Sequence, residues 1–447
     1  MNMLKFRALG KTVYYDERST FFSLDEPRQE EVQSFPPIPP IEELIAASKP
    51  TAYTFCVDVS DSCNLRCDYC FNETKTGKTI DAATAISYLE AMFHKYDSGE
   101  KYFVDMSGKG EPLLALKTVL EIARWCRRKQ DEIRKEVLPQ FVCNGTMLSP
   151  LVAEVLQNEG ILFGVSLDGN KQVHDSHRRD ANGNPTFDAI IDNVKSIRFR
   201  NYVGCAATLT KDVFPLVEAI DSLLPIFKTI SFRPARGAYA FDDSSGKLWE
   251  DQYERLGFRL LKDIERGDAS IFLALMNGED YFGRYLVRAI GFKRTIARCD
   301  ASISRFALDI DGKIYPCPAC CEAGLDVRSF VDGGLSAEFS IEAQAKSCLG
   351  CNIKYFCGGE CPINATHALG NEDALCRFRR KLITIAMVLS ETLRTTNTKL
   401  YDSLTVFCDE KILRQKANPK LAVFLNAHRN MSFTKAKAAF DKEYPSY

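Results

Sequence analysis

The chain has 447 residues, with a hydrophobic fraction of 45%, a charged fraction of 26% and a formal net charge of −1. This length predicts two or three domains, and this composition is typical of a soluble globular protein. Because the chain has no basic block and no apolar run of membrane length, we expect neither a nucleic-acid partner nor a membrane partner.

Seventeen cysteines are many for such a chain. Residues 1–7 lack the apolar core of a signal peptide, so we expect a cytoplasmic location. Cysteines in a long cytoplasmic chain indicate metal binding or catalysis rather than disulfides. Five of them lie scattered in apolar runs, where we expect buried, inert thiols: Cys56, Cys126, Cys143, Cys205 and Cys408.

Residues 1–50 read as an N-terminal extension. Short strand-like runs at 4–9, 12–15 and 20–24 precede a proline-rich segment, 35–40, that is typical of a stiff linker. We expect a strand or two that packs on the main domain.

Three cysteines follow the strand-like run 53–59 at the spacing C-x3-C-x2-C: Cys63, Cys67 and Cys70. A helical pattern begins near Asp81, which places the thiols on a loop at the carboxyl end of a strand. Three thiolates on such a loop can hold three corners of a cubane iron–sulfur cluster and leave its fourth iron open for chemistry. Structural cysteines or a partial zinc site are the alternatives.

Strand and helix patterns alternate from residue 53 to residue 235. Six β/α repeats without hairpin signals predict a parallel α/β sheet or barrel, in which ligands bind at the carboxyl ends of the strands. The expected strands are 53–59, 102–106, 140–143, 162–167, 203–209 and 229–232, and the expected helices are 81–96, 113–129, 150–158, 186–198 and 213–224.

Two glycines follow the second expected strand, Gly108 and Gly110. Glycines let backbone carbonyls approach a ligand closely, although either residue also fits an ordinary loop.

Residues 236–298 predict a helical bridge, in which Trp249, Tyr253 and Phe258 form one face that packs in the core or lines a cleft. After it, Asp311-Gly312 is a hairpin turn signal between strands 305–310 and 313–316. Residues 377–447 predict a helix to about residue 400 and a basic amphipathic segment, 426–440, that covers the preceding region.

A second group of cysteines surrounds the hairpin. It runs Cys299-x12-Gly312-x4-Cys317, then Cys348-x2-Cys351-x5-Cys357-x3-Cys361-x14-Cys376. Seven thiols exceed one tetrahedral site, so two metal centres are expected. Zinc is one candidate, since C-x2-C pairs commonly hold it.

The first cysteine loop, with the aromatic Tyr69 before its third cysteine, resembles the signature of radical S-adenosylmethionine (radical SAM) enzymes. The resemblance implies that Cys63, Cys67 and Cys70 bind a [4Fe–4S] cluster whose open iron chelates the amino and carboxylate groups of S-adenosylmethionine. One electron then cleaves the sulfonium to methionine and a 5′-deoxyadenosyl radical.

The strand-end residues resemble further motifs of these enzymes. Gly108, Gly110 and Glu111 resemble a G-G-E-P segment that holds the methionine amino group, with Lys109 in place of a glycine. Asn144 lies in a turn like T-N-G-T. By the same resemblance Ser166 and Asp168 lie near the ribose or substrate, Arg178 meets the S-adenosylmethionine carboxylate, and the strand at Ile230 covers the adenine. His174 and His177 are expected to be orienting or surface residues rather than metal ligands.

The second cysteine group resembles the SPASM extension of radical SAM enzymes. The resemblance implies that Cys348, Cys351, Cys357 and Cys376 hold one auxiliary [4Fe–4S] cluster. Cys299, Cys317 and Cys361 would hold another, and its fourth ligand is Cys320, Cys321 or the substrate. The expected fold is therefore a partial (β/α)6 TIM-type barrel, residues 51–235, followed after the bridge by a SPASM domain, 299–376, and a helical segment, 377–447.

The resemblance covers roughly residues 53–376 and implies a three-cluster enzyme that modifies a ribosomally made peptide. It would abstract hydrogen and form a crosslink or an oxidised side chain, with an electron donor such as flavodoxin or ferredoxin. The extension looks too short for a full leader-peptide-binding winged helix.

An anaerobic sulfatase-maturing enzyme, which makes formylglycine, is the first alternative. Such enzymes have an aspartate where this chain has Pro318, although Glu322 lies nearby in sequence. A zinc-stabilised peptide-binding module is the non-enzymatic alternative.

Overall fold

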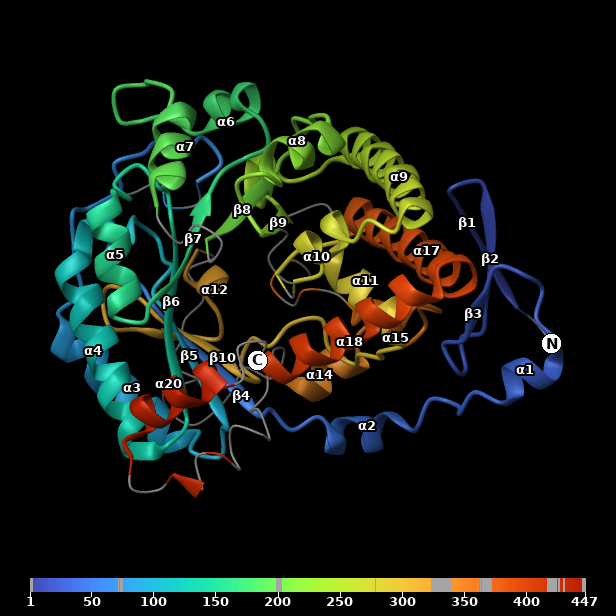
Figure 1. The fold of residues 1–447 in the computed structure, drawn as a ribbon, viewed down its shortest axis with the longest axis horizontal. Helices are drawn as coiled ribbons and strands as arrows, with labels where there is room; N and C mark the ends of the chain where they lie inside the picture. The colour runs from blue at the N-terminus through green and yellow to red at the C-terminus, as the bar shows by residue number, and fades with distance from the viewer. Residues whose placement is uncertain are drawn as a thin grey trace.

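Six parallel strands form the centre of the computed structural model (Figure 1). They are β4 (Ala52–Val57), β5 (Lys101–Asp105), β6 (Glu136–Cys143), β7 (Leu162–Ser166), β8 (Gly204–Leu209) and β9 (Thr229–Pro234), and each pairs with the next in chain order. All six overlap the expected strands. The expected α/β class with its parallel sheet is therefore confirmed.

The structure describes residues 3–70, 72, 75–197, 203–277, 279–322, 340–359, 361, 363, 372–415, 424, 427–428 and 431–443. Of residues 321, 322, 372 and 409–415 it describes the backbone alone. Among these residues no helix is long and apolar enough to cross a membrane.

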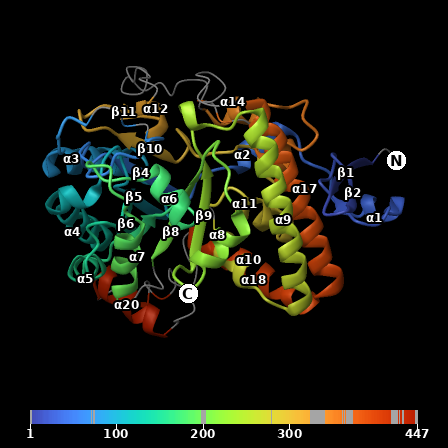
Figure 2. The same ribbon diagram turned by 90° about the horizontal axis from the view of Figure 1, so that it is seen from above.

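Helices cover the outer face of the sheet between successive strands (Figures 1 and 2). Their ends follow local signals: the Ser149 hydroxyl accepts a bond from Val152 N (3.2 Å) ahead of Pro150 at the first helical position, and Asp81 caps its helix in the same way. The helices are α3 (Ala82–Lys95), η1 (Pro112–Ala115) with α4 (Leu116–Ile133), α5 (Pro150–Asn158), α6 (Lys171–His177), α7 (Phe187–Ser196) and α8 (Leu216–Leu223). Helix α6 was not among the expected helices.

The hairpin expected near Asp311 joins the sheet instead of standing apart from it. Its strands β10 (Arg305–Leu308) and β11 (Ile314–Tyr315) are antiparallel, and β10 pairs in parallel with β4, Arg305 opposite Thr54. The sheet thus has eight strands in the order β11-β10-β4-β5-β6-β7-β8-β9. This pairing brings the second cysteine region to the first strand of the repeat.

Two long helices lie side by side beyond β9: α9 (Asp243–Arg266) and α17 (Glu372–Thr396) (Figure 2). Trp249 and Tyr253 of α9 are buried, and Tyr253 packs edge-on against Phe378. Phe258, expected on the same face, is 47% exposed. That expectation was wrong because nine positions are two and a half turns, which puts Phe258 opposite Trp249.

Further helices are α10 (Ser270–Leu275), α11 (Gly283–Ile290), α12 (Pro318–Glu322), α14 (Ile341–Lys346), α15 (Lys354–Cys357) and α18 (Thr398–Gln415). Of these, α12 packs on the hairpin strands β10 and β11. The C-terminal α20 (Phe433–Glu443) packs on α4, where Thr434 N donates to Asp131 (2.8 Å). The segment expected to cover the cysteine-rich region therefore lies against α4, and its buried Phe433 and Phe440 pack with Phe424 and Met431.

The N-terminal extension forms a sheet of its own, with strands β1 (Leu4–Ala8), β2 (Lys11–Tyr15) and β3 (Phe22–Ser23). It packs on α17, at the opposite end of the molecule from α3 to α5 (Figure 1). Helices α1 (Gln29–Gln33) and α2 (Ile41–Ala47) lead from it to β4. The expected packing on the main body is confirmed, with a three-stranded sheet in place of one or two strands.

Candidate active site

The first cysteine loop leaves the carboxyl end of β4, as the sequence predicts. The thiols of Cys63, Cys67 and Cys70 are half-buried, and a tight turn brings Cys70 N within 3.1 Å of the Cys67 carbonyl. Burial raises the pKa of Cys67 to about 11, against the opposing charge of Arg178. The neighbouring Cys70 and Cys63 also raise this pKa, so the three thiols lie within electrostatic range of one another.

The segment Ser107–Pro112 lies directly against this loop. A Cβ on Gly110 would come within 2.3 Å of the Ser62 carbonyl oxygen, and Glu111 N donates to that oxygen (2.7 Å). The amide of Asn72, just after the loop, donates to the Lys109 carbonyl (2.8 Å). Gly110 therefore lets two backbones meet, which is a different reason for glycine from the ligand approach that sequence analysis gave it.

Glu111 ties this segment to the turn after β6. Its buried carboxylate accepts bonds from Asn144 N (2.7 Å) and Leu113 N (3.1 Å), while burial raises its pKa to about 7. The Asn144 amide in turn donates to Asn64 Oδ1 (2.7 Å) and reaches Cys63 Sγ (3.9 Å). Glu111 and Asn144 thus meet at the cysteine loop.

Asp168, at the end of β7, is the centre of a buried polar network. Its carboxylate accepts bonds from Arg178 Nε (2.9 Å), from Thr208 N (2.8 Å) and from the Tyr69 hydroxyl. The Arg178 guanidinium lies over the Tyr69 ring, 5.3 Å from its centre. Burial raises the pKa of Asp168, but Arg178 outweighs burial, so that pKa lies below its usual value. Tyr69, Asp168 and Arg178 therefore form one unit.

His174 and His177 are buried, so their expected alternative as surface residues was wrong. Asp168 N donates to His174 Nδ1 (3.3 Å), and His174 Nε2 lies 3.0 Å from Thr186 Oγ1. Burial lowers the pKa of His174 to about 4, which keeps this acceptor nitrogen unprotonated. Both residues belong to α6, which places His174 beside Asp168 and His177 beside Asp68 of the cysteine loop.

The chain after α6 holds the cysteine loop from the other side. Arg66 N donates to the Arg179 carbonyl (2.7 Å) and Asp68 N to the His177 carbonyl (3.2 Å). The Asp68 carboxylate also lies 3.0 Å from His177 Nδ1. Together with Gly110 and Asn144, these contacts support the loop on three sides.

Ser166 and Ile230 are less directly connected to the cysteine loop than the residues described above. Ser166 is half-buried at the end of β7, opposite Ala206. Ile230 is buried, and its carbonyl accepts a bond from the Asn277 amide (2.9 Å). Among the described residues no hydrogen bond or ion pair joins either one to the cysteine loop.

Several residues of the site were not predicted from the sequence. Asn64 and Asn72 flank the cysteines and could have been chosen as polar neighbours of the motif. Asp58 directly follows β4, and burial raises its pKa to about 7. Tyr239, from the turn after β9, packs 6.4 Å from Tyr69 and is beside Asp68, whose charge raises the Tyr239 pKa. Nothing in the sequence pattern singles out Tyr239.

In the second cysteine region, Cys299, Cys317 and Cys361 are half-buried neighbours. Burial raises the pKa of Cys299 to about 12, and the nearby Cys361 and Cys317 add to this rise. Cys320 is fully buried, with its Sγ 3.6 Å from that of Cys317. The side chain of Cys321, the other expected candidate ligand, lies outside the described residues.

Cations surround the other four cysteines, Cys348, Cys351, Cys357 and Cys376. Arg379 Nη2 lies 3.4 Å from Cys376 Sγ, and Arg380 Nη2 lies 3.8 Å from Cys351 Sγ. Burial works against ionisation of Cys357, but Arg379, Arg298 and Arg288 outweigh it and hold the pKa of Cys357 below its usual value. Lys354, 1% exposed, is buried among these thiols.

These surroundings fit anionic clusters. A buried ammonium or guanidinium is costly without an anion, and thiolates bound to iron supply one. Among the described residues no three His, Cys, Asp or Glu side chains converge as a single metal ion requires. A cubane cluster needs a wider arrangement, since each thiolate binds its own iron.

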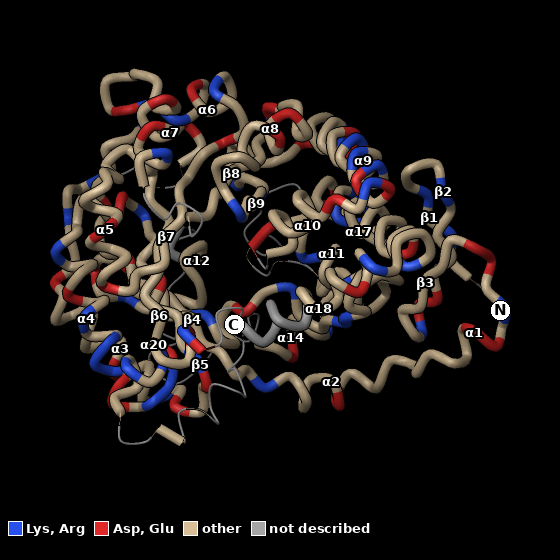
Figure 3. The backbone as a smooth tube through the Cα atoms, viewed as in Figure 1, with Lys and Arg blue, Asp and Glu red and all other residues tan. Residues whose placement is uncertain are grey.

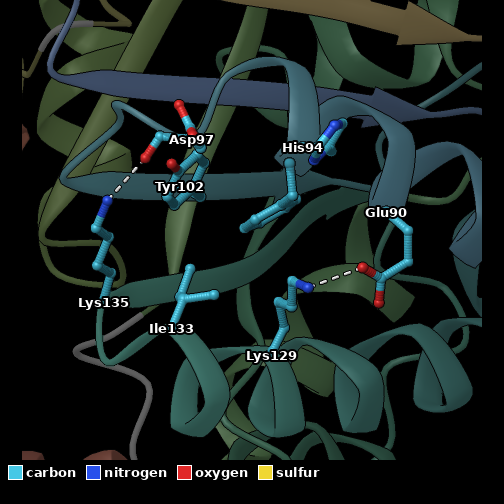
Figure 4. Close-up of a pocket in the computed structure, with 8 residues that line it drawn as sticks. Glu90, His94, Asp97, Tyr102, Lys129, Ile133 and Lys135 are labelled. Carbon is cyan, nitrogen blue, oxygen red and sulfur yellow. Dashed lines mark hydrogen bonds and ion pairs between the residues drawn. The ribbon is translucent and has the colours of Figure 1, made fainter.

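A separate pocket of ≈ 280 Å³ lies far from the cysteines, between α3, α4 and the start of β5 (Figure 4). Phe93, Tyr102 and Ile133 line it, and its lysines are engaged: Lys129 binds Glu90 (2.8 Å) and Lys135 binds the Asp97 carbonyl (2.8 Å). Basic and acidic residues are interspersed over the rest of the backbone (Figure 3). Neither feature competes with the cysteine loop as the active site.

Residues 57–210 match the Radical SAM superfamily. The serine-type anaerobic sulfatase-maturating enzyme of Klebsiella aerogenes is 23% identical over 339 residues, 71% of this chain and 81% of that enzyme. The cysteine-type anaerobic sulfatase-maturating enzyme of Clostridium perfringens (strain 13 / Type A) is 27% identical over 270 residues, 58% of this chain and 72% of that enzyme.

Solved structures share the fold. anSMEcpe with bound AdoMet superposes with a TM-score of 0.58 at 17% identity, over 77% of this chain and 100% of that chain. SuiB of Streptococcus suis bound to its precursor peptide SuiA gives a TM-score of 0.51 at 12% identity, over 84% of this chain and 98% of that chain. Radical SAM enzymes use a [4Fe–4S] cluster and S-adenosylmethionine. The chain thus contains a radical SAM domain and is homologous to the anaerobic sulfatase-maturating enzymes.

Proposed function

We propose that the chain is a radical SAM/SPASM enzyme that modifies a ribosomally made peptide. It abstracts hydrogen from the peptide with a 5′-deoxyadenosyl radical and leaves a crosslink or an oxidised side chain. The observation that carries this proposal is the convergence of three separate segments, at Gly110, Asn144 and His177, on the loop with Cys63, Cys67 and Cys70. The sulfatase-maturating relatives, whose names denote action on a protein, support a peptide substrate.

Cys63, Cys67 and Cys70 would hold the [4Fe–4S] cluster, which when bound supplies the electron that cleaves S-adenosylmethionine. The chain's own residues would bind and orient S-adenosylmethionine. The backbone of Gly108–Glu111 and the Arg178 guanidinium would receive the amino and carboxylate ends of S-adenosylmethionine. Asp168 holds Arg178 and Tyr69 in place for that task.

The second cysteine region would hold two auxiliary [4Fe–4S] clusters, for three in total. Cys348, Cys351, Cys357 and Cys376 form one ligand set, and Cys299, Cys317 and Cys361 belong to the other. The proposed location is the cytoplasm, where thiols are kept reduced. A flavodoxin or ferredoxin is the proposed electron donor.

Formylglycine formation is the second candidate function, favoured by the sequence relatives. Against it, α12 begins with Pro318 directly after Cys317, where the sulfatase-maturing enzymes have a proton-accepting aspartate. Proline has no acid–base group. Conversion of a Cys-x-Pro-x-Arg peptide to formylglycine at a useful rate would establish this second function instead.

The decisive experiment is anaerobic reconstitution of the full chain with iron and sulfide. We expect an iron protein that makes 5′-deoxyadenosine from S-adenosylmethionine on reduction. Deuterium transfer into 5′-deoxyadenosine from labelled candidate peptides then identifies the substrate and the abstraction site. A protein that binds zinc and no iron would refute the proposal and favour the zinc-stabilised binding module.

A further inference from the structure

Lys354 is buried in an unusual setting for an ammonium group. Lys354 is the first residue of α15, three positions after Cys351 and three before Cys357, and it is 1% exposed. Nζ donates to the Gln344 carbonyl (2.7 Å), the Gly358 carbonyl (3.4 Å) and the Ser347 hydroxyl (3.5 Å). All three partners are neutral oxygens.

The backbone leaves room for this ammonium. Gly359 has φ +92, and a Cβ there would lie 2.7 Å from Lys354 Nζ and 2.7 Å from Ser347 Oγ. Any other residue at this position would displace the charge. The missing side chain of Gly359 therefore leaves the space that the Lys354 ammonium group occupies.

Arg379 approaches the same cysteines from α17 and is 1% exposed. Two backbone carbonyls hold its guanidinium, Leu375 O (3.0 Å from Nε) and Gly359 O (3.1 Å from Nη1). Its Nη2 faces Cys376 Sγ at 3.4 Å. Gly359 is thus shared, since its Cα leaves room for Lys354 and its carbonyl binds Arg379.

Burial lowers the pKa of Lys354, and the charges of Cys348, Cys357 and Cys351 act in the opposite direction without cancelling that effect. A buried cation surrounded by neutral oxygens is stable only beside an anion. Hydrogen bonds to cluster sulfurs, net charge and burial set the reduction potential of an iron–sulfur cluster. A fixed positive charge at the sulfurs stabilises the state with one more electron.

We propose that Lys354 and Arg379 are redox-tuning residues, which raise the reduction potential of the auxiliary cluster held by Cys348, Cys351, Cys357 and Cys376 above that of the other auxiliary cluster. The inference rests on the proposed function only in that these four cysteines hold a cluster.

The test uses the reconstituted full chain with Cys63, Cys67 and Cys70 changed to Ala, so that only the auxiliary clusters give signals. Redox titration followed by electron paramagnetic resonance measures both midpoints without S-adenosylmethionine or peptide. Lys354→Gln and Arg379→Gln remove the buried charges. Lys346→Gln and Arg377→Gln are matched controls, because these residues lie as close in sequence to Cys348 and Cys376 but are exposed.

At a fixed potential we expect Lys354→Gln to lower the reduced-to-oxidised ratio of one cluster about tenfold, a shift of about 59 mV for a one-electron couple. Arg379→Gln lowers the ratio of the same cluster, and the other cluster does not shift. The controls shift neither, because water screens exposed charges. Equal shifts in the buried and exposed variants would overturn the inference.

If Lys354→Gln loses the cluster altogether, the iron content of Lys354→Arg shows whether the positive charge or the lysine side chain itself is required. Retention of iron in Lys354→Arg supports a role for the charge, and loss in both variants overturns it. Chains that bind iron and cleave S-adenosylmethionine with unshifted potentials refute this inference alone, whereas chains that bind no iron refute the proposed function.

Discussion

The Arg178 guanidinium and the Asp168 carboxylate form a buried ion pair, with Nε and Oδ2 2.9 Å apart. The same carboxylate accepts the hydroxyl of Tyr69, which stands between two cysteines of the loop. A residue expected to meet S-adenosylmethionine is therefore already oriented by a carboxylate, and that carboxylate is linked to the cysteine loop.

Arg178→Ala should both weaken S-adenosylmethionine binding and destabilise the fold, by about 3–5 kcal/mol, because Asp168 is left buried and unpaired. Calorimetric binding and thermal unfolding measure the two effects. Arg179→Ala is the matched control: its Nε bonds only a backbone carbonyl, Asp175 O (2.9 Å), at the surface. Equal binding in both variants would show that another residue meets the carboxylate.

Changing Cys63, Cys67 and Cys70 together to Ala should abolish 5′-deoxyadenosine production and remove about four iron atoms per chain. The auxiliary iron should remain, because its cysteines lie in other elements. Iron analysis and product quantification test this. Production of 5′-deoxyadenosine by the triple variant would contradict the assignment of the active site.

Gly110→Ala should displace the cysteine loop, since the new Cβ would lie 2.3 Å from Ser62 O and 2.5 Å from Ser60 O. We expect loss of the loop's iron and of activity in a folded chain. Gly246→Ala is the control, because its Cβ would meet only the Ala374 side chain at an ordinary contact distance of 3.5 Å. Normal iron content in Gly110→Ala would mean that the two segments can separate at little cost.

Acidification should destabilise the protein through His174. Its folded pKa of about 4 lies below its unfolded value of 6.5, so the unfolded chain takes up a proton that the folded chain does not. The associated stability is complete above pH 6.5 and falls by up to about 3 kcal/mol towards pH 4. His174→Asn keeps an acceptor for Asp168 N and should lose less thermal stability between pH 7 and pH 5. An identical loss would exclude His174 as the cause.

Cys320→Ala should remove iron from the auxiliary site with Cys299, Cys317 and Cys361 if its thiol is the fourth ligand. Cys320 is fully buried, and its Sγ is 3.6 Å from the Sγ of Cys317, one of the proposed ligands. Cys408→Ala, another buried thiol, is the control. Full iron content in Cys320→Ala would mean that Cys320 is not the fourth ligand. Loss of iron in Cys321→Ala would then identify Cys321 as that ligand, and full iron content there would indicate an open iron.

Sequence periodicity predicted the six parallel strands and the cysteine loop because apolar runs and motif spacing are local properties. The residues that contact the cysteine loop could be predicted only in part from the sequence. Asn144 and Asp168 were named from their motifs, but the contact of Gly110 with Ser62 needs the packed backbone. The exposure of Phe258 follows from helical geometry and was misjudged. The parallel pairing of β10 with β4 and the place of Tyr239 depend on contacts between distant segments, which no local pattern encodes.

The pairing of β10 with β4 also affects synthesis. Roughly 250 residues separate Thr54 from its partner Arg305, and at about 5–20 residues per second translation takes roughly 12–50 s to cover them. During that time the backbone of β4 is an open edge next to the nascent loop of Cys63. Open edges attract other strands, so this interval is when the chain most needs protection from aggregation. Completion of the sheet by β10 closes that edge and ends the vulnerable period.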